Sequence, residues 1–185
     1  RAIQFNSLFL NPYLWKLQLG GKRLVQKARQ SGAPIDGVVV SAGSPELEEA
    51  VDLIDELNSV GIAHVVFKPG TVEQIRSVIR IAAEVPTKPV IVHIEGGRAG
   101  GHHSWEDLDD LLLSTYSELR GRSNITVCVG GGIGTPEQWA AIDPVGRAFG
   151  AALGVTTPGA AFAVDGAVST GQTLIRARKT VANAC

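Results

Sequence analysis

Short apolar runs alternate with segments of helical periodicity along most of this chain, and this alternation limits the folds that the chain can adopt. β-Branched residues dominate runs such as 35–41 and 125–129, as expected for strands buried on both faces. Between the runs, apolar residues recur at helical spacing, for example over 47–57. A strand and a helix together repeat roughly every 25–30 residues, which is typical of βα units around a parallel sheet. We therefore predict an α/β fold.

Six strands are expected, over 2–10, 35–41, 62–68, 89–92, 125–129 and 162–164. Helical patterns lie between them; the pattern over 13–30 is broken at Gly20-Gly21, and Thr71 with Gln74 matches a capping box. Ser104 with Asp107 is a looser cap for the following helix. Polar or glycine-rich residues fall at the carboxyl ends of the strands, at Asn6, Ser41, Lys68, 96–103, 130–134 and 169–171.

Two architectures fit this alternation, an open doubly wound sheet and a (β/α)8 TIM barrel. Both place ligands at the carboxyl ends of their strands, but an open sheet uses mainly one crevice, where the strand order reverses. Several functional-looking strand ends therefore favour the barrel. The sequence contains about six of its eight βα units, so we expect a fragment of a barrel.

Composition excludes several classes of protein. With 185 residues, 44% hydrophobic content and a net charge of -1, the chain has the size of one globular domain and lacks the basic face of a nucleic-acid-binding protein. No apolar run reaches the length of a membrane span, and no secretory signal is visible. Two cysteines make no disulfide framework, which favours the cytoplasm. Because no methionine is present, even at position 1, we expect a piece of a longer polypeptide.

The glycine-rich turn over 95–104, EGGRAGGHHS, is the strongest candidate for a site, because such a turn lets the backbone approach a ligand closely. His102 and His103 are adjacent and no third ligand sits at a typical spacing, so no metal site is expected. His102 suits proton donation, and a structural hydrogen bond is the alternative for either histidine and is preferred for His103. Arg98 could pair with Glu95, pair with an acid of the next helix, or bind an anionic cofactor.

A second glycine-rich turn, over 130–134, offers backbone N–H groups to an anion, and the turn over 169–171 would complete a phosphate cradle. No lysine follows in the pattern of a Walker loop. The helix after the first turn begins with four carboxylates (Glu106, Asp107, Asp109 and Asp110), so phosphate is expected at the second turn. Lys68, at a strand end, is a further functional candidate, whereas His64, His93 and Cys128 are expected in the core.

The segment 96–107, GGRAGGHHSWED, resembles the signature of the enoyl reductase domain of type I fatty acid synthases of bacterial (mycobacterial-type) and fungal form. The segments 5–12, 67–70 and 129–134 resemble further blocks of that domain in the same order. The whole is similar to the wider nitronate monooxygenase-like FMN barrels. The resemblance covers about residues 2–139 of a partial domain over 1–185 and does not extend convincingly into 140–185.

This resemblance implies an FMN-containing barrel that uses NADPH to reduce a trans-2-enoyl thioester carried on acyl carrier protein. It implies a cytoplasmic, multifunctional synthase in which this domain contacts other domains of the same protein, assembled as a homo-oligomer, a hexamer by family resemblance. Two alternatives remain open: a nitronate monooxygenase-type flavoenzyme on the same barrel, and a non-catalytic structural module of a large synthase.

The resemblance also assigns residues. His102 aligns with the active-site histidine, Asn6 and Ser7 would contact the flavin, and Gly100 and Gly101 would pass close to its ring. The turn at 131–134 would hold its phosphate. The complete set of expected cofactor-binding residues is Asn6, Ser7, Lys68, Gly97, Ala99, Gly100, Gly101, Gly131, Gly132, Gly134, Thr170 and Gly171.

Overall fold

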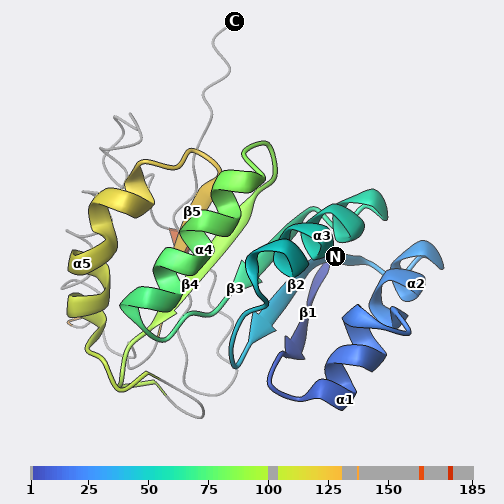
Figure 1. The fold of residues 1–185 in the computed structure, drawn as a ribbon, viewed down its shortest axis with the longest axis horizontal. Coiled ribbons are helices and arrows are strands. Elements are labelled where there is room, and N and C mark those ends of the chain that lie inside the picture. Colours follow the sequence, from blue (N-terminus) through green and yellow to red (C-terminus); the bar gives the residue numbers. More distant parts are fainter. Residues whose placement is uncertain (1, 100–103, 131–136, 138–162, 165–174, 177–185) are drawn as a thin grey trace, which may run out of the picture.

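The computed structural model describes residues 2–99, 104–130, 137, 163–164 and 175–176. Strands and helices alternate as predicted (Figure 1). In chain order the elements are β1 (Ile3–Leu8), α1 (Pro12–Trp15), the π-helix η1 (Lys16–Gly20), α2 (Leu24–Gln30), β2 (Ile35–Ser41), α3 (Leu47–Ser59), β3 (His64–Phe67), α4 (Val72–Glu84), β4 (Val90–Glu95), α5 (Leu108–Arg120), β5 (Ile125–Gly130), β6 (Ala163–Val164) and β7 (Ile175–Arg176).

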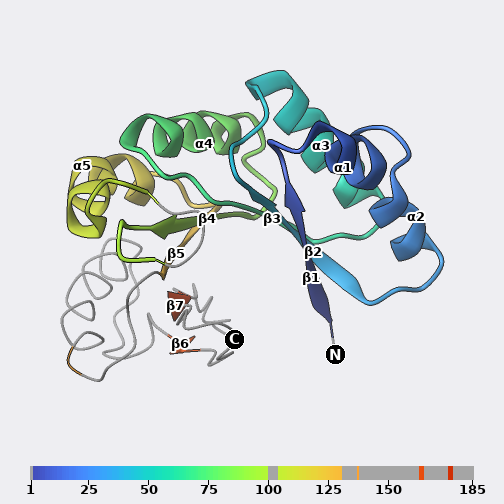
Figure 2. The ribbon, with the colours of Figure 1, turned by 90° about the horizontal axis from the view of Figure 1, so that it is seen from below.

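The strands form one sheet in the order β1-β2-β3-β4-β5-β7-β6. The first five strands are parallel and neighbour one another in chain order. Helices α1 to α5 all lie along the same face of this curved sheet (Figure 2). The strands β1 to β5 and their helices are thus arranged as consecutive βα units.

The predicted sixth strand is the clearest difference between the sequence pattern and the fold. We expected the segment 162–164 to continue the series of parallel strands. Instead, β7 pairs antiparallel with β5, and β6 pairs antiparallel with β7. A run of three apolar residues carries too little pattern to fix a strand's neighbour or direction, so the prediction of a sixth parallel strand is wrong.

Strand β4 is longer than its apolar run. The sequence predicted a strand ending at Val92, but the strand continues to Glu95 and is buried along its whole length. Side chains alternate between faces of a strand, so Ile94 packs in the core under the helices while His93 and Glu95 share the opposite face with Ile91. The extension therefore carries two polar side chains on the face without helices.

The segment before β2 contains the predicted helix break. Asn11 caps α1 by accepting a hydrogen bond from Leu14 N–H at 3.0 Å, with Pro12 at the first helical position. The chain then passes into η1, where Gly21 N–H donates to the Lys16 carbonyl at 2.9 Å. Gly20-Gly21 marks the break as expected. None of the helices in the described part of the chain combines the length and apolar character that a membrane span requires.

The caps of α4 and α5 agree with the sequence only in part. Thr71 caps α4 and accepts from Gln74 N–H at 3.1 Å, which confirms this half of the predicted capping box, whereas the Gln74 side chain accepts from Gly70 N–H at 2.8 Å and not from Thr71 N–H. The N-cap of α5 is Asp107, not Ser104. Ser104 instead donates its hydroxyl to the Gly70 carbonyl. This bond ties the loop after β4 to the loop after β3.

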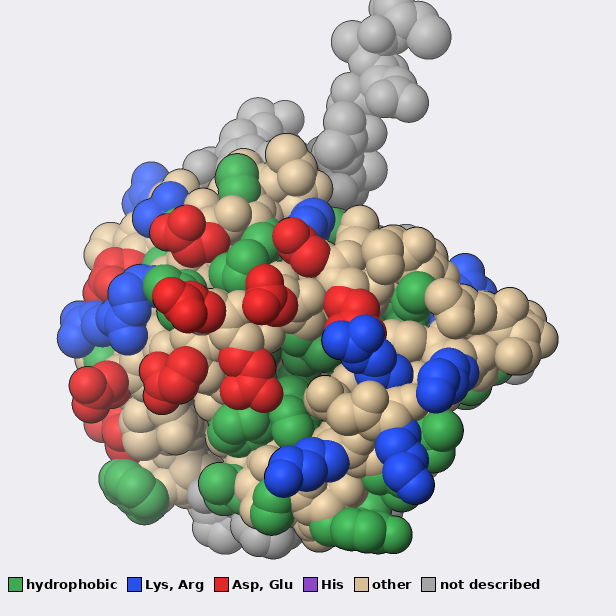
Figure 3. Space-filling model, turned by 45° about the vertical axis from the view of Figure 1, so that its right-hand side comes forward, with side chains coloured by type: hydrophobic (Ala, Val, Ile, Leu, Met, Phe, Trp, Pro, Cys, Tyr) green, Lys and Arg blue, Asp and Glu red, His purple; other side chains and the backbone are tan. Residues whose placement is uncertain are grey.

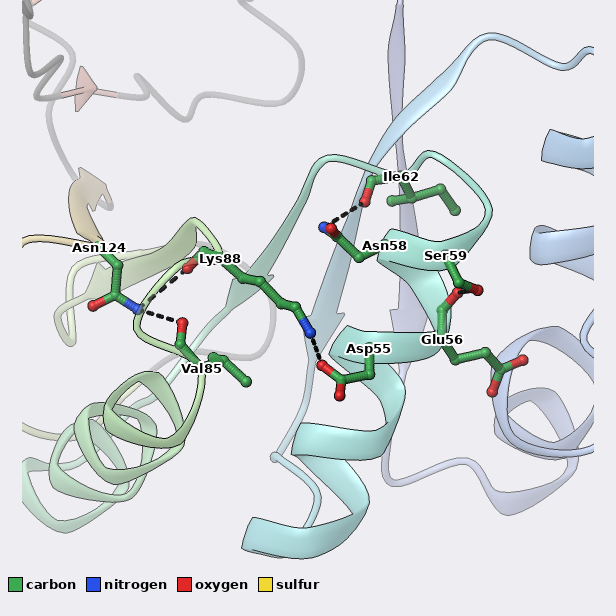
Figure 4. A network of polar contacts seen from close by, with 8 residues as sticks. All are labelled: Asp55, Glu56, Asn58, Ser59, Ile62, Val85, Lys88 and Asn124. Atoms are coloured by element: carbon green, nitrogen blue, oxygen red, sulfur yellow. Dashed lines mark hydrogen bonds and ion pairs between the residues drawn. The ribbon is translucent and has the colours of Figure 1, made fainter.

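Hydrogen bonds and an ion pair connect the segments at the amino ends of β4 and β5 to neighbouring elements. Asn124, just before β5, donates to the carbonyls of Val85 and Lys88 at 3.0 and 3.2 Å (Figure 4). The Lys88 ammonium pairs with Asp55 of α3. These bonds join the turns that precede β4 and β5 to the neighbouring helices. Polar groups at this end of the sheet thus satisfy one another.

Charge is distributed unevenly over the helices although the net charge is close to zero. Basic side chains and no acidic ones occur over 12–30, whereas α3 carries acidic side chains and no basic ones. In Figure 3 the acidic side chains gather on one side of the visible surface, whereas basic side chains lie both beside them and on the other side. The Arg23 guanidinium and the Glu56 carboxylate, 2.9 Å apart, join the two regions.

Candidate functional site

A cavity of about 460 Å³ lies at the carboxyl ends of β1 to β4, within the size range of small-molecule sites. Residues from four successive strand ends and their loops line it, as expected for a site at this edge of a parallel sheet. The lining residues are Leu8, Leu10, Ser41, Ala42, Gly43, Lys68, Pro69, Gly70, Thr71, Gln74, His93, Glu95, Ser104 and Trp105.

Lys68 and Glu95 form an ion pair in this cavity. Lys68 directly follows β3 and Glu95 ends β4, and Nζ lies 3.1 Å from Oε1. The Glu95 side chain is only 7% exposed and that of Lys68 is 23% exposed. Burial of a carboxylate requires compensation, which the Lys68 ammonium supplies. Lys68, a functional candidate from the sequence, thus has Glu95 as its partner, a pairing that the sequence did not reveal.

His93 completes this cluster from the same face of β4. Its Nε2 lies 3.4 Å from Glu95 Oε1. Burial, and secondarily the charge of Lys68, lower the pKa of His93 from 6.5 to about 3. The imidazole is therefore neutral near physiological pH, and its contact with Glu95 is not an ion pair. The sequence correctly placed His93 in the interior but did not reveal that it lines the cavity.

Two buried polar atoms of the cluster lack a well-aligned hydrogen bond. Neither His93 Nε2 nor Glu95 Oε1 has such a partner among the described residues, although Lys68 compensates the carboxylate charge at 3.1 Å. Buried polar atoms are nearly always satisfied in folded proteins. Since both residues line the cavity, these atoms are available to a bound ligand.

The predicted residues of β1 lie on opposite faces of that strand. Asn6 accepts a hydrogen bond from Ser41, a lining residue, at 3.0 Å. Ser7 is buried and donates its hydroxyl to Gln18 of η1 at 2.8 Å, on the helix side of the sheet. Its side chain is thus satisfied away from the cavity, which leaves only its backbone for a contact with a cofactor.

The described part of the first glycine-rich turn packs against α5. A Cβ on Gly96 would lie 2.7 Å from the backbone nitrogen and from Cβ of Leu108, so this position requires glycine for packing. Gly97 N–H donates to the Glu106 carbonyl at 2.9 Å, and Ala99 is buried. Arg98 is exposed. The sequence offered Glu95 as one possible partner of Arg98, but Glu95 pairs with Lys68 instead.

The remaining predicted site residues lie outside the described residues. These are the candidate acid His102 and the cofactor-binding candidates Gly100, Gly101, Gly131, Gly132, Gly134, Thr170 and Gly171. Gly130, the last described residue before the second turn, lies beside the cluster, since a Cβ there would be 2.7 Å from His93 Nε2. The cluster therefore adjoins the start of both glycine-rich turns.

Comparison with known proteins relates this chain to fatty acid synthases. Residues 89–147 match a family model described as "Fatty acid synthase subunit beta/Fas1-like, helical". In the described residues this region contains α5 between β4 and β5.

Relatives are found among fungal proteins. The chain is 39% identical over 138 residues to "Fatty acid synthase 2" of Mycosarcoma maydis, covering 75% of this chain and 4% of that protein. It is 41% identical over 135 residues to "Fatty acid synthase subunit beta" of Schizosaccharomyces pombe, covering 72% and 6%. The beta subunit of Aspergillus oryzae is 39% identical over 139 residues, covering 75% and 6%. The chain is thus similar to a segment that spans 4–6% of the length of these relatives.

Proposed function

We propose that this chain is part of the enoyl-[acyl-carrier-protein] reductase domain of a multifunctional type I fatty acid synthase. The proposed reaction reduces a trans-2-enoyl thioester with NADPH as hydride donor and FMN as the resident cofactor. One observation carries the proposal. The Lys68–Glu95 pair and the neutral His93 meet in a cavity at the carboxyl ends of β3 and β4, in a chain similar to a segment of fatty acid synthase beta subunits.

The arrangement of the strands supports a barrel as the proposed fold. A doubly wound sheet has helices on both faces and a reversal in strand order. Here β1 to β5 follow in chain order and their helices share one face, as in consecutive units of a (β/α)8 barrel. In such a barrel the cavity would lie at the end where active sites occur.

The donors and acceptors of the cavity fit a flavin. One edge of the flavin ring offers an N–H donor between two carbonyl acceptors, which matches a carboxylate such as Glu95 beside an ammonium such as Lys68. His93 Nε2 and Glu95 Oε1 are two buried atoms at this cavity that lack a well-aligned partner among the described residues. When bound, FMN would supply hydride transfer from NADPH to the β-carbon of the thioester. We propose the glycine turns at 100–101 and 131–134 for its ring and phosphate.

A proton must also reach the α-carbon of the substrate, and we propose His102 as its source. His93 is unsuited to this task, because a histidine with a pKa of about 3 carries no excess proton near neutral pH. His93 would instead offer a fixed hydrogen bond inside the cavity. In this proposal His93 positions the ligand and His102 transfers the proton.

The partners and location follow from the same proposal. An acyl carrier protein domain would present the enoyl thioester, and other domains of the synthase would surround this one. We propose a cytoplasmic homo-oligomer, a hexamer by family resemblance.

The test uses the full-length protein that carries this chain. Flavin absorbance measures bound FMN, and anaerobic assays follow NADPH oxidation with crotonyl thioester. We expect bound FMN and thioester reduction, with His102→Ala slowing reduction by about 100-fold or more while FMN stays bound. Oxygen consumption with an alkyl nitronate in place of thioester reduction would indicate a nitronate monooxygenase. Failure to bind or reconstitute FMN would leave a structural module.

A further inference from the structure

Two consecutive residues after β2 adopt left-handed backbone conformations at the wall of the cavity that holds Lys68. Ala42 has a φ of 56° and Gly43 has a φ of 105°, and both residues line the cavity. Glycine adopts such a φ without strain, whereas alanine does so at a steric cost. Among the described residues, Arg23 is the one other non-glycine residue with a positive φ. Strained backbone of this kind concentrates at functional sites.

This conformation turns two successive backbone N–H groups to the same side of the chain. The Ser41 carbonyl accepts from Phe9 N–H at 2.9 Å, and so points towards the segment after β1. The Ala42 carbonyl accepts from Leu10 N–H at 3.2 Å and points the same way. In a planar trans peptide the N–H group points opposite to the carbonyl. The N–H groups of Ala42 and Gly43 therefore both point away from β1, towards the end of β3 on the other side of β2.

These two N–H groups have no acceptor among the described residues. The hydrogen bonds between β2 and β3 end with Lys68 N–H, which donates to the Val40 carbonyl at 3.2 Å. Beyond that bond, neither Ala42 N–H nor Gly43 N–H donates to a described backbone or side-chain acceptor. Successive N–H groups on one side of the chain form a concave donor site. The same cavity also contains the two buried side-chain atoms without a well-aligned partner, which independently indicate a ligand.

The charges around this N–H pair favour a neutral acceptor over a full anion. Lys68 is the one cation among the described residues that line the cavity, and Glu95 already compensates its charge. Glu48 and Glu49 lie in the first turn of α3, which follows the pair closely in the chain. A phosphate would therefore meet carboxylates without a free cation to balance it. A carbonyl oxygen accepts two hydrogen bonds and carries no net charge, so it fits the pair better.

An apolar wall beside the N–H pair indicates what the carbonyl is attached to. Leu8 and Leu10 line the cavity on the β1 side, and they are 39% and 73% exposed. A Cβ on Gly43 would lie 3.6 Å from Leu10 Cγ, so the pair adjoins this wall. Exposed apolar side chains at a cavity suit an apolar part of a ligand. An acyl compound offers both parts, a carbonyl oxygen for the N–H groups and a hydrocarbon chain for the leucines.

We propose that the backbone N–H groups of Ala42 and Gly43 hold the carbonyl oxygen of the thioester substrate, an inference that rests on the proposed function. A hydride that originates in NADPH forms a C–H bond at the β-carbon and breaks the C=C π bond. The displaced electron pair forms a double bond between the α-carbon and the carbonyl carbon, which leaves negative charge on the carbonyl oxygen. Two fixed N–H donors stabilise this charge until a proton reaches the α-carbon and the carbonyl re-forms. The N–H pair is thus an oxyanion site.

Infrared spectroscopy of the full-length protein tests the N–H pair without relying on turnover. The probe is a crotonyl thioester labelled with ¹³C at the carbonyl and bound in the absence of NADPH. Two N–H donors should lower its carbonyl stretch below the frequency in water. Ala42→Gly adopts the left-handed conformation without strain and should keep this shift, with a reduction rate within about 3-fold of wild type. Ala42→Val disfavours the conformation, so it should abolish the shift and slow reduction by about 100-fold or more.

Arg23→Val is the matched control for the strain that valine introduces. Arg23 has a φ of 55° at the N-cap of α2 and does not line the cavity. This variant should strain the backbone to a similar degree and leave the carbonyl stretch, the FMN content and the reduction rate unchanged. If Ala42→Val does not fold, the wild-type spectrum decides, because a carbonyl stretch at or above the frequency in water overturns the proposal.

The possible failures are distinguishable. If Ala42→Val folds, binds FMN and reduces the thioester at the wild-type rate, the oxyanion site is wrong and the reductase proposal stands. The same conclusion follows if Ala42→Val shifts the carbonyl bands of bound FMN and not that of the thioester, because the pair then holds a flavin oxygen. If Ala42→Val abolishes a lowered thioester stretch in a protein that neither holds FMN nor reduces the thioester, the carbonyl site stands and the reductase proposal is wrong.

Discussion

Lys68 Nζ lies 3.1 Å from Glu95 Oε1, and the two residues come from the carboxyl ends of neighbouring parallel strands. Phe67 is in register with Val92, so the chain direction brings Lys68 beside the last residues of β4. The carboxylate is the more buried partner. Removing Lys68 and removing Glu95 should therefore change the free energy of unfolding by different amounts.

Replacing Lys68 should destabilise the fold more than replacing Glu95. Lys68→Met leaves a buried carboxylate without compensation and should lower the free energy of unfolding by about 2–3 kcal/mol, less than for a fully buried pair because Lys68 keeps some contact with water. Glu95→Gln leaves an ammonium that can turn to solvent and should cost about 1 kcal/mol. Urea denaturation of both variants and of the double variant checks this order. A larger loss for Glu95→Gln would contradict it.

His93 should make stability fall as the pH is lowered from 6.5 towards 3. The pKa of His93 is lowered by burial to about 3 in the folded state, against 6.5 for an exposed histidine, so the unfolded state binds more protons in this window. This destabilisation by His93 is absent above pH 6.5 and complete below about pH 3. Its slope is on the order of 1 kcal/mol per pH unit at most.

The difference between the stability of the protein and of His93→Gln, measured as a function of pH, isolates this effect from other acids. The wild-type curve should fall more steeply below pH 6.5 than the curve of the variant. Parallel curves would show that His93 titrates normally in the folded state.

Gly130→Ala should disturb the cluster by steric overlap. The added Cβ would lie 2.7 Å from His93 Nε2, so the ring or the strand must shift, at a cost of about 1–3 kcal/mol. Gly121→Ala is the matched control, because its nearest atoms are carbonyl oxygens at 3.5 Å. The control should stay within about 0.5 kcal/mol of wild type in thermal unfolding. Equal effects of the two changes would rule out the overlap.

Loss of the Thr71 cap should loosen the start of α4. Thr71→Ala removes the acceptor for Gln74 N–H and should cost about 1 kcal/mol, whereas Thr71→Ser keeps the hydroxyl and should cost much less. Hydrogen exchange of the Gln74 amide measures the effect locally. Faster exchange in both variants would show that the methyl group, and not the hydroxyl, matters there.

Elements with strong local signals were predictable from the sequence. The β2 run, the Thr71 cap and the break at Gly20-Gly21 depend on neighbouring residues, and the structure confirms each of them. The end of β4 was not predictable, because His93 and Glu95 are polar and the periodic signal stops at Val92. Their burial depends on contacts with other strands and not on their own pattern.

The similarity to fatty acid synthases was also readable from the sequence. The glycine-rich segment at 96–107 carried the resemblance, and the chain is similar to fungal fatty acid synthase proteins over part of its length. The reductase activity, the cofactors and His102 remain our proposals.

The sequence by itself determined the alternation of strands and helices, the carboxyl-end position of polar residues and the Thr71 cap, because these follow from periodicity and short-range bonds. Tertiary structure alone decided that Lys68 compensates Glu95, that His93 is held neutral beside them, and that β7 rather than β6 follows β5. The physical reason is distance along the chain. Burial, pKa and strand neighbour depend on residues that only folding brings together.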